Sequence, residues 1–288
     1  MSLHLELENI YYRYRGIAAS QDHILRGISF EVRPRECVAL VGPSGSGKTT
    51  LIQHFTGLLK PDRGHIRVDG ENIWSRKYDF VNLRRRIGLV FQFPEGQLFE
   101  ESVEKDVAFA PSNLGLAQSE IDKRVSDALT AVGLPYDQFA ARSPFSLSAG
   151  EKRRVAIAGI LAMNPELIVF DEPTAGMDPK GVGRMKSLIR QLLQKGHTCM
   201  IISHHMDFIS AVARRVLVLI NGKLIFDDTV GELFKNNTVM ERASLEQSEF
   251  RQALLRYQSC LPAELLHTTH WEEFHRKLSN LNLRQKKS

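Results

Sequence analysis

A glycine-rich segment that follows an apolar run constrains the fold of this chain more than any other feature. The segment reads Gly42-Pro43-Ser44-Gly45-Ser46-Gly47-Lys48-Thr49. An apolar run at 37–41 precedes it, and a helical stretch that begins at Thr50 follows it. Such glycines let the backbone curl so that successive amides point at phosphate oxygens, and the helix adds its positive N-terminal end. The order of strand, loop and helix therefore predicts a phosphate-binding loop rather than an accidental glycine-rich turn.

Two side chains of this loop and two acids farther along predict the chemistry. Lys48 can place a positive charge on the β- and γ-phosphates of a nucleotide, and the Thr49 hydroxyl can ligate magnesium. An apolar run at 167–170 ends in Asp171 and Glu172, where an open α/β sheet presents ligands at its carboxyl edge. Adjacent carboxylates there are costly without a cation. We therefore expect Asp171 to hold magnesium and Glu172 to polarise an attacking water as general base.

The distribution of apolar residues predicts the rest of the organisation. Near-continuous apolar runs, including 86–91 and 198–202, are typical of strands buried on both faces of a parallel sheet. The opening segment 3–14 alternates with a period of two, which predicts a β-rich beginning. Helical patterns dominate about 93–164, and polar, amphipathic helical sequence follows after about 235. We therefore predict an α/β domain over 1–235 and a helical extension over 236–288.

Composition excludes several classes of protein. No apolar run approaches the ~20 residues that a membrane-spanning helix needs, and the N-terminus has no basic head or apolar signal core. Cys37, Cys199 and Cys260 are scattered, as expected for free thiols in the cytoplasm. The formal charge of +5 is spread along the chain, so we expect no nucleic-acid partner.

Four further segments carry a resemblance to a known family. They are Gln92 after the run 86–91, Leu147-Ser148-Ala149-Gly150-Glu151, Ala175-Gly176-Met177-Asp178, and Ser203-His204. In this order they resemble the glutamine loop, signature loop, aspartate loop and switch histidine of ATP-binding cassette ATPases, over roughly the first 235 residues. The resemblance implies a P-loop NTPase (RecA-like) core with an antiparallel β subdomain, a helical subdomain and the C-terminal helical extension.

The resemblance also implies roles for these residues. Gln92 would contact magnesium and sense a transmembrane partner, His204 would hold the γ-phosphate and the attacking water, and Asp178 would tie two subunits together. Tyr14 matches the aromatic that stacks on adenine, although a plain surface tyrosine remains the alternative. The residues expected to bind ATP are thus Tyr14, Gly42, Pro43, Ser44, Gly45, Ser46, Gly47, Lys48, Thr49, Thr50 and Gln92. Those expected to hold Mg²⁺ are Thr49, Gln92 and Asp171.

The signature segment departs from the family pattern at Ala149 and Glu151, where a glycine and a glutamine are usual. Ser148 and Glu151 form the Ser-x-x-Glu capping box of a helix that we expect to reach about Met163, so helix initiation alone explains them. The same helix start offers amides to the γ-phosphate of a partner chain, with Ser148 and Gly150 as the contacts. Both interpretations stay open. A carboxylate near a triphosphate is repulsive, so we expect slow turnover unless Glu151 points away.

The segments 91–101, 106–111, 153–159 and 173–181 resemble the ATPase subunits of energy-coupling factor transporters, most closely the second ATPase subunit of that group. The resemblance implies uptake of a vitamin or a metal ion at the cytoplasmic face of the membrane. It implies as partners a second ATPase subunit in a homodimer or heterodimer, a transmembrane coupling protein and a substrate-binding membrane subunit. The extension 236–288 would add dimer contacts. The alternatives are another ABC transporter and a soluble nucleic-acid-linked ABC ATPase.

The segment after Gln92 is compatible with docking to a partner. Phe93 and Phe99 can line a hydrophobic groove, while Glu95, Glu100 and Glu101 can meet basic residues on a partner helix. The alternative is that the phenylalanines belong to the core and that the glutamates form a solvated face.

Overall fold

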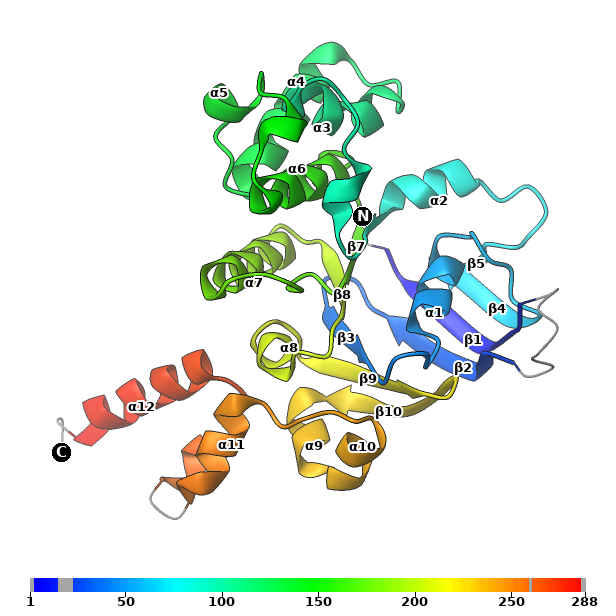
Figure 1. Cartoon of the computed structure of the whole chain (residues 1–288). Coiled ribbons are helices and arrows are strands. Elements are labelled where there is room, and N and C mark those ends of the chain that lie inside the picture. Colours follow the sequence, from blue (N-terminus) through cyan, green and yellow to red (C-terminus); the bar gives the residue numbers. More distant parts are fainter. Residues whose placement is uncertain (1–2, 15–22, 259–260, 286–288) are drawn as a thin grey trace.

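The computed structural model describes residues 3–14, 23–258 and 261–285 of the 288-residue chain (Figure 1). Cys260 lies outside the described residues, as do the parts of the predicted units that fall in 1–2, 15–22, 259–260 and 286–288. Within the described ranges, no helix combines the length and the apolar character needed to cross a membrane.

A six-stranded sheet forms the centre of the described structure. Its strand order is β10-β9-β3-β8-β7-β6, and every pair is parallel except β10 with β9. The strands are β3 (Cys37–Val41), β6 (Ile87–Val90), β7 (Leu167–Asp171), β8 (Thr198–Ile202), β9 (Arg215–Ile220) and β10 (Lys223–Thr229). All of β3 and β8 is buried, which confirms the parallel strands predicted from the apolar runs.

A second, antiparallel sheet covers one face of the first. Its strands are, in spatial order, β2 (Leu25–Val32), β1 (Leu5–Tyr12), β4 (Arg63–Val68) and β5 (Glu71–Asn72). Alternate residues of β3 contribute to different cores: Val38 and Leu40 pack in the core shared with the second sheet, and Ala39 and Val41 pack in the core under the helices. This alternation explains why β3 is apolar throughout.

Helices flank the six-stranded sheet on both sides. The helix α1 (Lys48–Phe55) packs in the core shared with the second sheet, and α2 (Phe80–Arg86) precedes β6. The helices α7 (Pro179–Gln194) and α8 (Met206–Val212) pack in the other core. Because α1 follows β3 after only a short loop, its N-terminus lies at the carboxyl edge of the sheet, where parallel α/β proteins bind ligands.

A group of helices lies beyond the edge of the sheet, at the top of Figure 1. It comprises α3 (Val103–Ser112), α4 (Gln118–Ala131), α5 (Tyr136–Phe139) and α6 (Ala149–Ala162), with the short turns η1 (Pro94–Gln97) and η2 (Pro144–Ser146). Apolar residues of α3, α4 and α6 pack together in the same core as α7 and α8. These elements fall within 93–164, although the boundaries of a separate subdomain stay a prediction.

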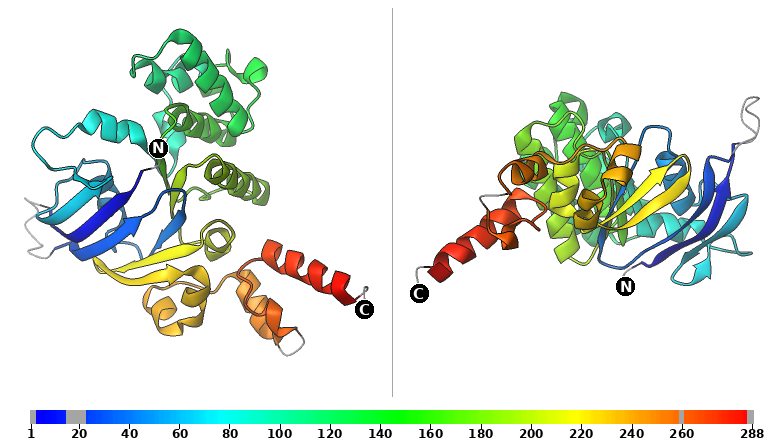
Figure 2. Two further views of the ribbon diagram at one scale, coloured as in Figure 1. Left: turned by 180° about the vertical axis from the view of Figure 1, so that it is seen from behind. Right: turned by 90° about the horizontal axis from the view of Figure 1, so that it is seen from below.

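The C-terminal part is helical; its first two helices pack in the core with apolar side chains such as Leu233 and Met240, and polar contacts attach the later helices. It comprises α9 (Val230–Lys235), α10 (Asn237–Arg242), α11 (Glu249–Arg256), η4 (Ala263–Leu265) and α12 (Trp271–Gln285). The Asp207 carboxylate of α8 accepts hydrogen bonds from the backbone amides of Glu249 at 2.9 Å and Phe250 at 3.3 Å, at the start of α11. Arg190 of α7 forms an ion pair of 2.6 Å with Glu272 of α12. Figure 2 shows α12 leading away from both sheets.

Candidate active site

The loop between β3 and α1 has a backbone that only glycine adopts easily. Gly42 and Gly47 have φ values of 146° and 104°. A Cβ at Gly42 would lie 2.0 Å from the backbone oxygen of Leu219, so no side chain fits there. Gly47 is also the N-cap of α1, and the helix begins at Lys48 rather than at Thr50. The loop therefore leaves the first amides of α1 free for an anion.

Lys48 lies folded over this loop. Its Nζ donates hydrogen bonds to the backbone oxygens of Gly42 at 2.8 Å and Pro43 at 2.9 Å. Burial lowers the pKa of the Lys48 ammonium, while the carboxylates of Glu172 and Asp171 oppose that shift. An ammonium so placed can exchange carbonyl partners for phosphate oxygens without leaving the loop.

The two acids stand at the carboxyl end of β7. Burial raises the pKa of the Asp171 carboxyl, the neighbouring Glu172 adds to the rise, and Lys48 opposes it. Gln92 follows β6 at the same sheet edge with an exposed side chain, because β6 and β7 are parallel neighbours. The Thr49 hydroxyl, the Asp171 carboxylate and the Gln92 amide offer oxygen donors, the chemistry that Mg²⁺ prefers. The donor atoms of these three residues therefore have the chemistry that a magnesium site needs.

Glu172 is held by the end of the adjacent strand β8. His204 Nδ1 lies 2.9 Å from Glu172 Oε1, and the Ser203 hydroxyl donates a hydrogen bond of 3.2 Å to Oε2. The Glu172 side chain is 17% exposed and the His204 side chain is 80% exposed, so the pair faces outward from the sheet edge. The role of Ser203 was missed from sequence, where it served only to mark the segment before His204.

Tyr14 lies beyond the end of β1 and contacts α1. Its hydroxyl lies 3.3 Å from Thr50 Oγ1 and donates a hydrogen bond of 3.2 Å to Gln53 Oε1. The Tyr12 ring packs against it edge-on, with ring centroids 5.1 Å apart. Tyr14 therefore presents a half-exposed ring beside the helix of the phosphate loop, which a surface tyrosine and an adenine platform would both satisfy.

The signature segment forms the start of α6. The Glu151 amide approaches the Ser148 hydroxyl at 3.4 Å, and Glu151 Oε2 accepts hydrogen bonds from the Ser148 amide at 2.9 Å and the Ser148 hydroxyl at 2.6 Å. This is the predicted capping box, and the helix ends at Ala162 with Met163 as its C-cap. The Glu151 carboxylate is thus bound to Ser148 of its own chain, and its direction relative to a bound triphosphate stays a prediction. The hydrogen bonds from Ser148 lower the pKa of the Glu151 carboxyl, against a smaller opposing effect of burial.

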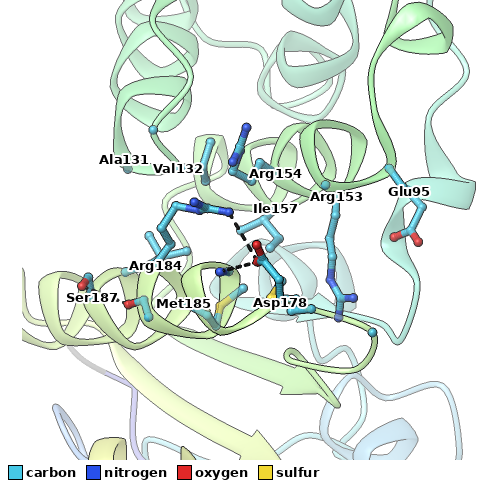
Figure 3. Close-up of a pocket in the computed structure, with 18 of the residues that line it drawn as sticks. Glu95, Ala131, Val132, Arg153, Arg154, Ile157, Asp178, Arg184, Met185 and Ser187 are labelled. Atoms are coloured by element: carbon cyan, nitrogen blue, oxygen red, sulfur yellow. Dashed lines mark hydrogen bonds and ion pairs between the residues drawn. The ribbon is translucent and has the colours of Figure 1, made fainter.

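The signature residues do not meet the phosphate loop of the same chain. Gly150 and Asp178 instead line a cleft of about 1160 Å³ between α6 and α7 (Figure 3). Asp178 is the N-cap of α7, where its Oδ1 accepts a hydrogen bond of 2.7 Å from the Gly181 amide. A Cβ at Gly150 would have no neighbour within 4 Å in the described chain, so this helix start is open to an approaching group.

The aromatic residues after Gln92 are exposed. Phe93 and Phe99 are each 56% exposed, so the alternative that places them in the core is wrong. Leu98 between them is buried. The Asp106 carboxylate of α3 accepts hydrogen bonds from the Phe99 amide at 2.9 Å and the Glu100 amide at 3.0 Å. These bonds fix the segment with the Phe99 ring outward.

A phosphate loop and an acidic strand end at one edge of a parallel sheet define a P-loop nucleotide-binding protein. The family model described as ABC transporter matches residues 25–175. The chain therefore belongs to the ABC transporter family, whose members hydrolyse ATP to power transport.

Similar proteins place the chain more exactly within the ABC transporter family. The chain is 44% identical over 242 residues to the energy-coupling factor transporter ATP-binding protein EcfA2 of Clostridium perfringens, covering 84% of this chain and 85% of that protein. It is also similar to the structure of cbiO1 from Clostridium perfringens, part of the ABC transporter complex cbiONQ. That similarity has a TM-score of 0.75 and 35% identity over 90% of this chain and 98% of the other.

A third similarity concerns a dimer. The dimeric post-hydrolysis structure of the ATP-binding cassette MJ0796 with ADP and Pi matches with a TM-score of 0.69 and 27% identity, over 78% of this chain and 98% of that one. Together with the relatives above, it places the chain among the ATP-binding subunits of energy-coupling factor transporters, with the ABC ATPase fold.

Proposed function

We propose that this chain hydrolyses MgATP at an interface with a second ATPase subunit and thereby drives an energy-coupling factor importer for a vitamin or a metal ion. The observation that carries the proposal is the contact of Glu172 with both Ser203 and His204, at the sheet edge where Lys48 and the phosphate loop lie. A carboxylate held in this way has a fixed direction in which to accept a proton.

The proposed binding step starts at the phosphate loop. The free amides of α1 and the loop accept the phosphates, and the Lys48 ammonium exchanges the oxygens of Gly42 and Pro43 for phosphate oxygens. Tyr14 stacks on the adenine, and Thr50 supports the tyrosine through its hydroxyl. Thr49, Asp171 and Gln92 would hold Mg²⁺, which would supply positive charge near the phosphate oxygens.

The proposed hydrolytic step belongs to Glu172 and His204. Glu172 accepts a proton from the attacking water at its carboxylate, while Ser203 keeps that carboxylate oriented. His204, which is largely exposed, turns from Glu172 to hold the water and the γ-phosphate. The reaction gives ADP and phosphate, and the proton leaves through Glu172.

The second subunit completes the site in this proposal. Gly150 and Asp178 line the cleft between α6 and α7, and Ser148 caps the start of α6 next to Gly150. These three residues therefore suit the nucleotide of a partner. The dimeric structure of MJ0796 supports this arrangement. The γ-phosphate binds groups from both subunits, so its hydrolysis lets the pair reopen.

Docking to the membrane partners is proposed at the exposed aromatic segment. Phe99 packs edge-on against Phe109, with ring centroids 4.9 Å apart, and both rings are exposed. Glu100 and Glu101 flank this apolar patch. A helix of a transmembrane coupling protein with basic and apolar residues suits such a surface. A substrate-binding membrane subunit then selects the cargo, and the chain lies at the cytoplasmic face of the membrane as a peripheral subunit.

Gentle detergent extraction of the tagged full-length chain from its native host tests this proposal. Mass spectrometry of the co-purified proteins should find a polytopic membrane protein and an ABC ATPase subunit. The matched control is an equally tagged, unrelated cytoplasmic protein extracted in parallel. Recovery of the chain alone, or with nucleic-acid machinery, would contradict the transporter assignment and leave the ATPase assignment standing.

A further inference from the structure

Arg153 connects the signature helix to the loop that carries Glu172. It lies on α6, is 6% exposed, and extends from the helix toward the loop after β7 (Figure 3). Its Nη1 donates to the backbone oxygen of Ala175 at 2.7 Å, and its Nη2 donates to the backbone oxygens of Glu172 at 3.1 Å and Pro173 at 2.9 Å. One side chain thus holds three carbonyls of the loop between the general base and Asp178.

The charge of Arg153 is met by carbonyl oxygens and not by a carboxylate in the described residues. Burial lowers the pKa of its guanidinium, and the nearest opposing influence comes from Glu95 without an ion pair between them in the described residues. The Nε atom is buried and has no hydrogen-bond partner there. A buried charge of this kind is costly compared with an apolar side chain of similar size. Simple packing between α6 and the loop therefore does not require an arginine.

The loop needs external support. Glu172 has a positive φ of 46°, a strained conformation for a residue with a Cβ. Its amide donates a hydrogen bond of 2.8 Å to the Ile202 oxygen, and its own carbonyl accepts from Arg153. Strained backbone persists where the surroundings determine it, and Arg153 supplies the support from the side of α6. The direction of the Glu172 carboxylate depends on this backbone.

We propose that Arg153 is a positioning residue, which ties the signature helix to the backbone of Glu172 so that α6 and the general base move as one unit. The proposal rests on the proposed function, because it assumes that Ser148 contacts the nucleotide of a partner and that Glu172 is the base. When the start of α6 moves against the nucleotide held by the partner subunit, Arg153 then shifts Glu172 at the site of its own chain. Arg153 itself does not touch the substrate.

The planar fork of the guanidinium makes this role specific to arginine. It presents several N–H groups in fixed directions, whereas the lysine ammonium is a compact charge on a flexible stem. Arg153→Lys keeps the positive charge and most of the volume but cannot hold all three carbonyls in the same geometry. This variant therefore separates the positioning role from the charge.

The test compares Arg153→Lys with wild type in the full chain, co-purified with its partners. Steady-state ATP hydrolysis should show kcat lowered by about tenfold or more, since small misplacements of a catalytic group have large effects. The KM for ATP should stay within about twofold, because the phosphate loop is untouched. Arg153→Gln is measured in parallel, so that failure of one variant to fold does not decide the result.

Arg124→Lys is the matched control. Arg124 lies in the same group of helices and donates a hydrogen bond of 3.3 Å to the backbone oxygen of Met163, far along α6 from the catalytic loop. Its kcat should equal that of wild type. An unchanged kcat in folded Arg153→Lys, or an equal fall in both variants, would overturn the positioning role. A wild-type rate no higher than that of Glu172→Gln would instead refute the proposed function.

Discussion

Replacing Glu151 by glutamine should accelerate ATP hydrolysis by the assembled subunits. In the structure the Ser148 hydroxyl donates to the Glu151 carboxylate at 2.6 Å, so this hydroxyl is committed to its own chain. To reach a γ-phosphate it must give up that bond. Glutamine still accepts from the Ser148 amide and keeps the capping box, but it carries no charge. The change therefore weakens the bond that holds the hydroxyl without removing the helix cap.

The size of the effect follows from the type of bond that changes. A hydrogen bond to a charged group contributes about 1.5–3 kcal/mol and a neutral one about 0.5–1.5 kcal/mol. The difference of about 1 kcal/mol corresponds to roughly a fivefold rise in rate if hydroxyl release limits closure. Removal of the repulsion between Glu151 and the phosphate acts in the same direction.

The assay is phosphate release at saturating MgATP, with wild type and Glu151→Gln purified as complexes. Glu151→Asp is the control, since it keeps the negative charge and should give no increase. The midpoint of thermal unfolding should change by less than about 2 °C, because the cap persists. A rate for Glu151→Gln equal to or below that of wild type, at an unchanged unfolding midpoint, would refute this reasoning.

Three further predictions concern the remaining parts of the site. Lys48→Ala should weaken MgATP binding at least about tenfold, because charge-assisted bonds to phosphate are lost; isothermal titration calorimetry that gives an unchanged Kd would contradict this. Asp171→Asn should raise the unfolding midpoint of the nucleotide-free chain at neutral pH and lower Mg²⁺-dependent hydrolysis. Burial and the neighbouring Glu172 raise the pKa of the Asp171 carboxyl in the folded chain above its ordinary value. The stability that the protonated carboxyl contributes is therefore complete below the ordinary pKa and is lost as pH rises through the folded pKa. The difference in unfolding midpoint between Asp171→Asn and wild type should therefore widen from about pH 4 to pH 7. A difference that stays constant over this range would count against the raised pKa. Glu100→Lys combined with Glu101→Lys should release the chain from membranes, whereas Glu71→Lys on β5 should not; equal membrane recovery of both would argue against docking at the aromatic segment.

Local patterns predict most of the fold. The apolar runs become the buried parallel strands because each is apolar on both of its faces, and the capping box fixes the start of α6. The boundaries of the first strand differ from the prediction, since β1 ends at Tyr12 although the alternation continues to Tyr14. Past that strand the backbone turns toward α1, where tertiary contacts rather than periodicity determine the path.

Contacts between distant segments account for what the sequence did not predict. Ser203 reaches Glu172 only because β7 and β8 are neighbours and end at the same edge. In the sequence Arg153 is one of several basic residues near the start of α6. Its three carbonyl partners follow it by 19 to 22 residues, in a loop whose conformation no periodic pattern predicts. The outward direction of Phe99 likewise depends on the hydrogen bonds that the Phe99 and Glu100 amides donate to Asp106.

The most direct test of the account is the rate of phosphate release by the Glu172→Gln variant, in the full chain purified with its partners. Glutamine preserves the size of the side chain and one acceptor oxygen but cannot accept the proton of the attacking water. The account predicts that MgATP still binds with an affinity close to that of wild type and that phosphate release falls by at least about a hundredfold. A variant that kept the wild-type rate would contradict the assignment of Glu172 as the general base.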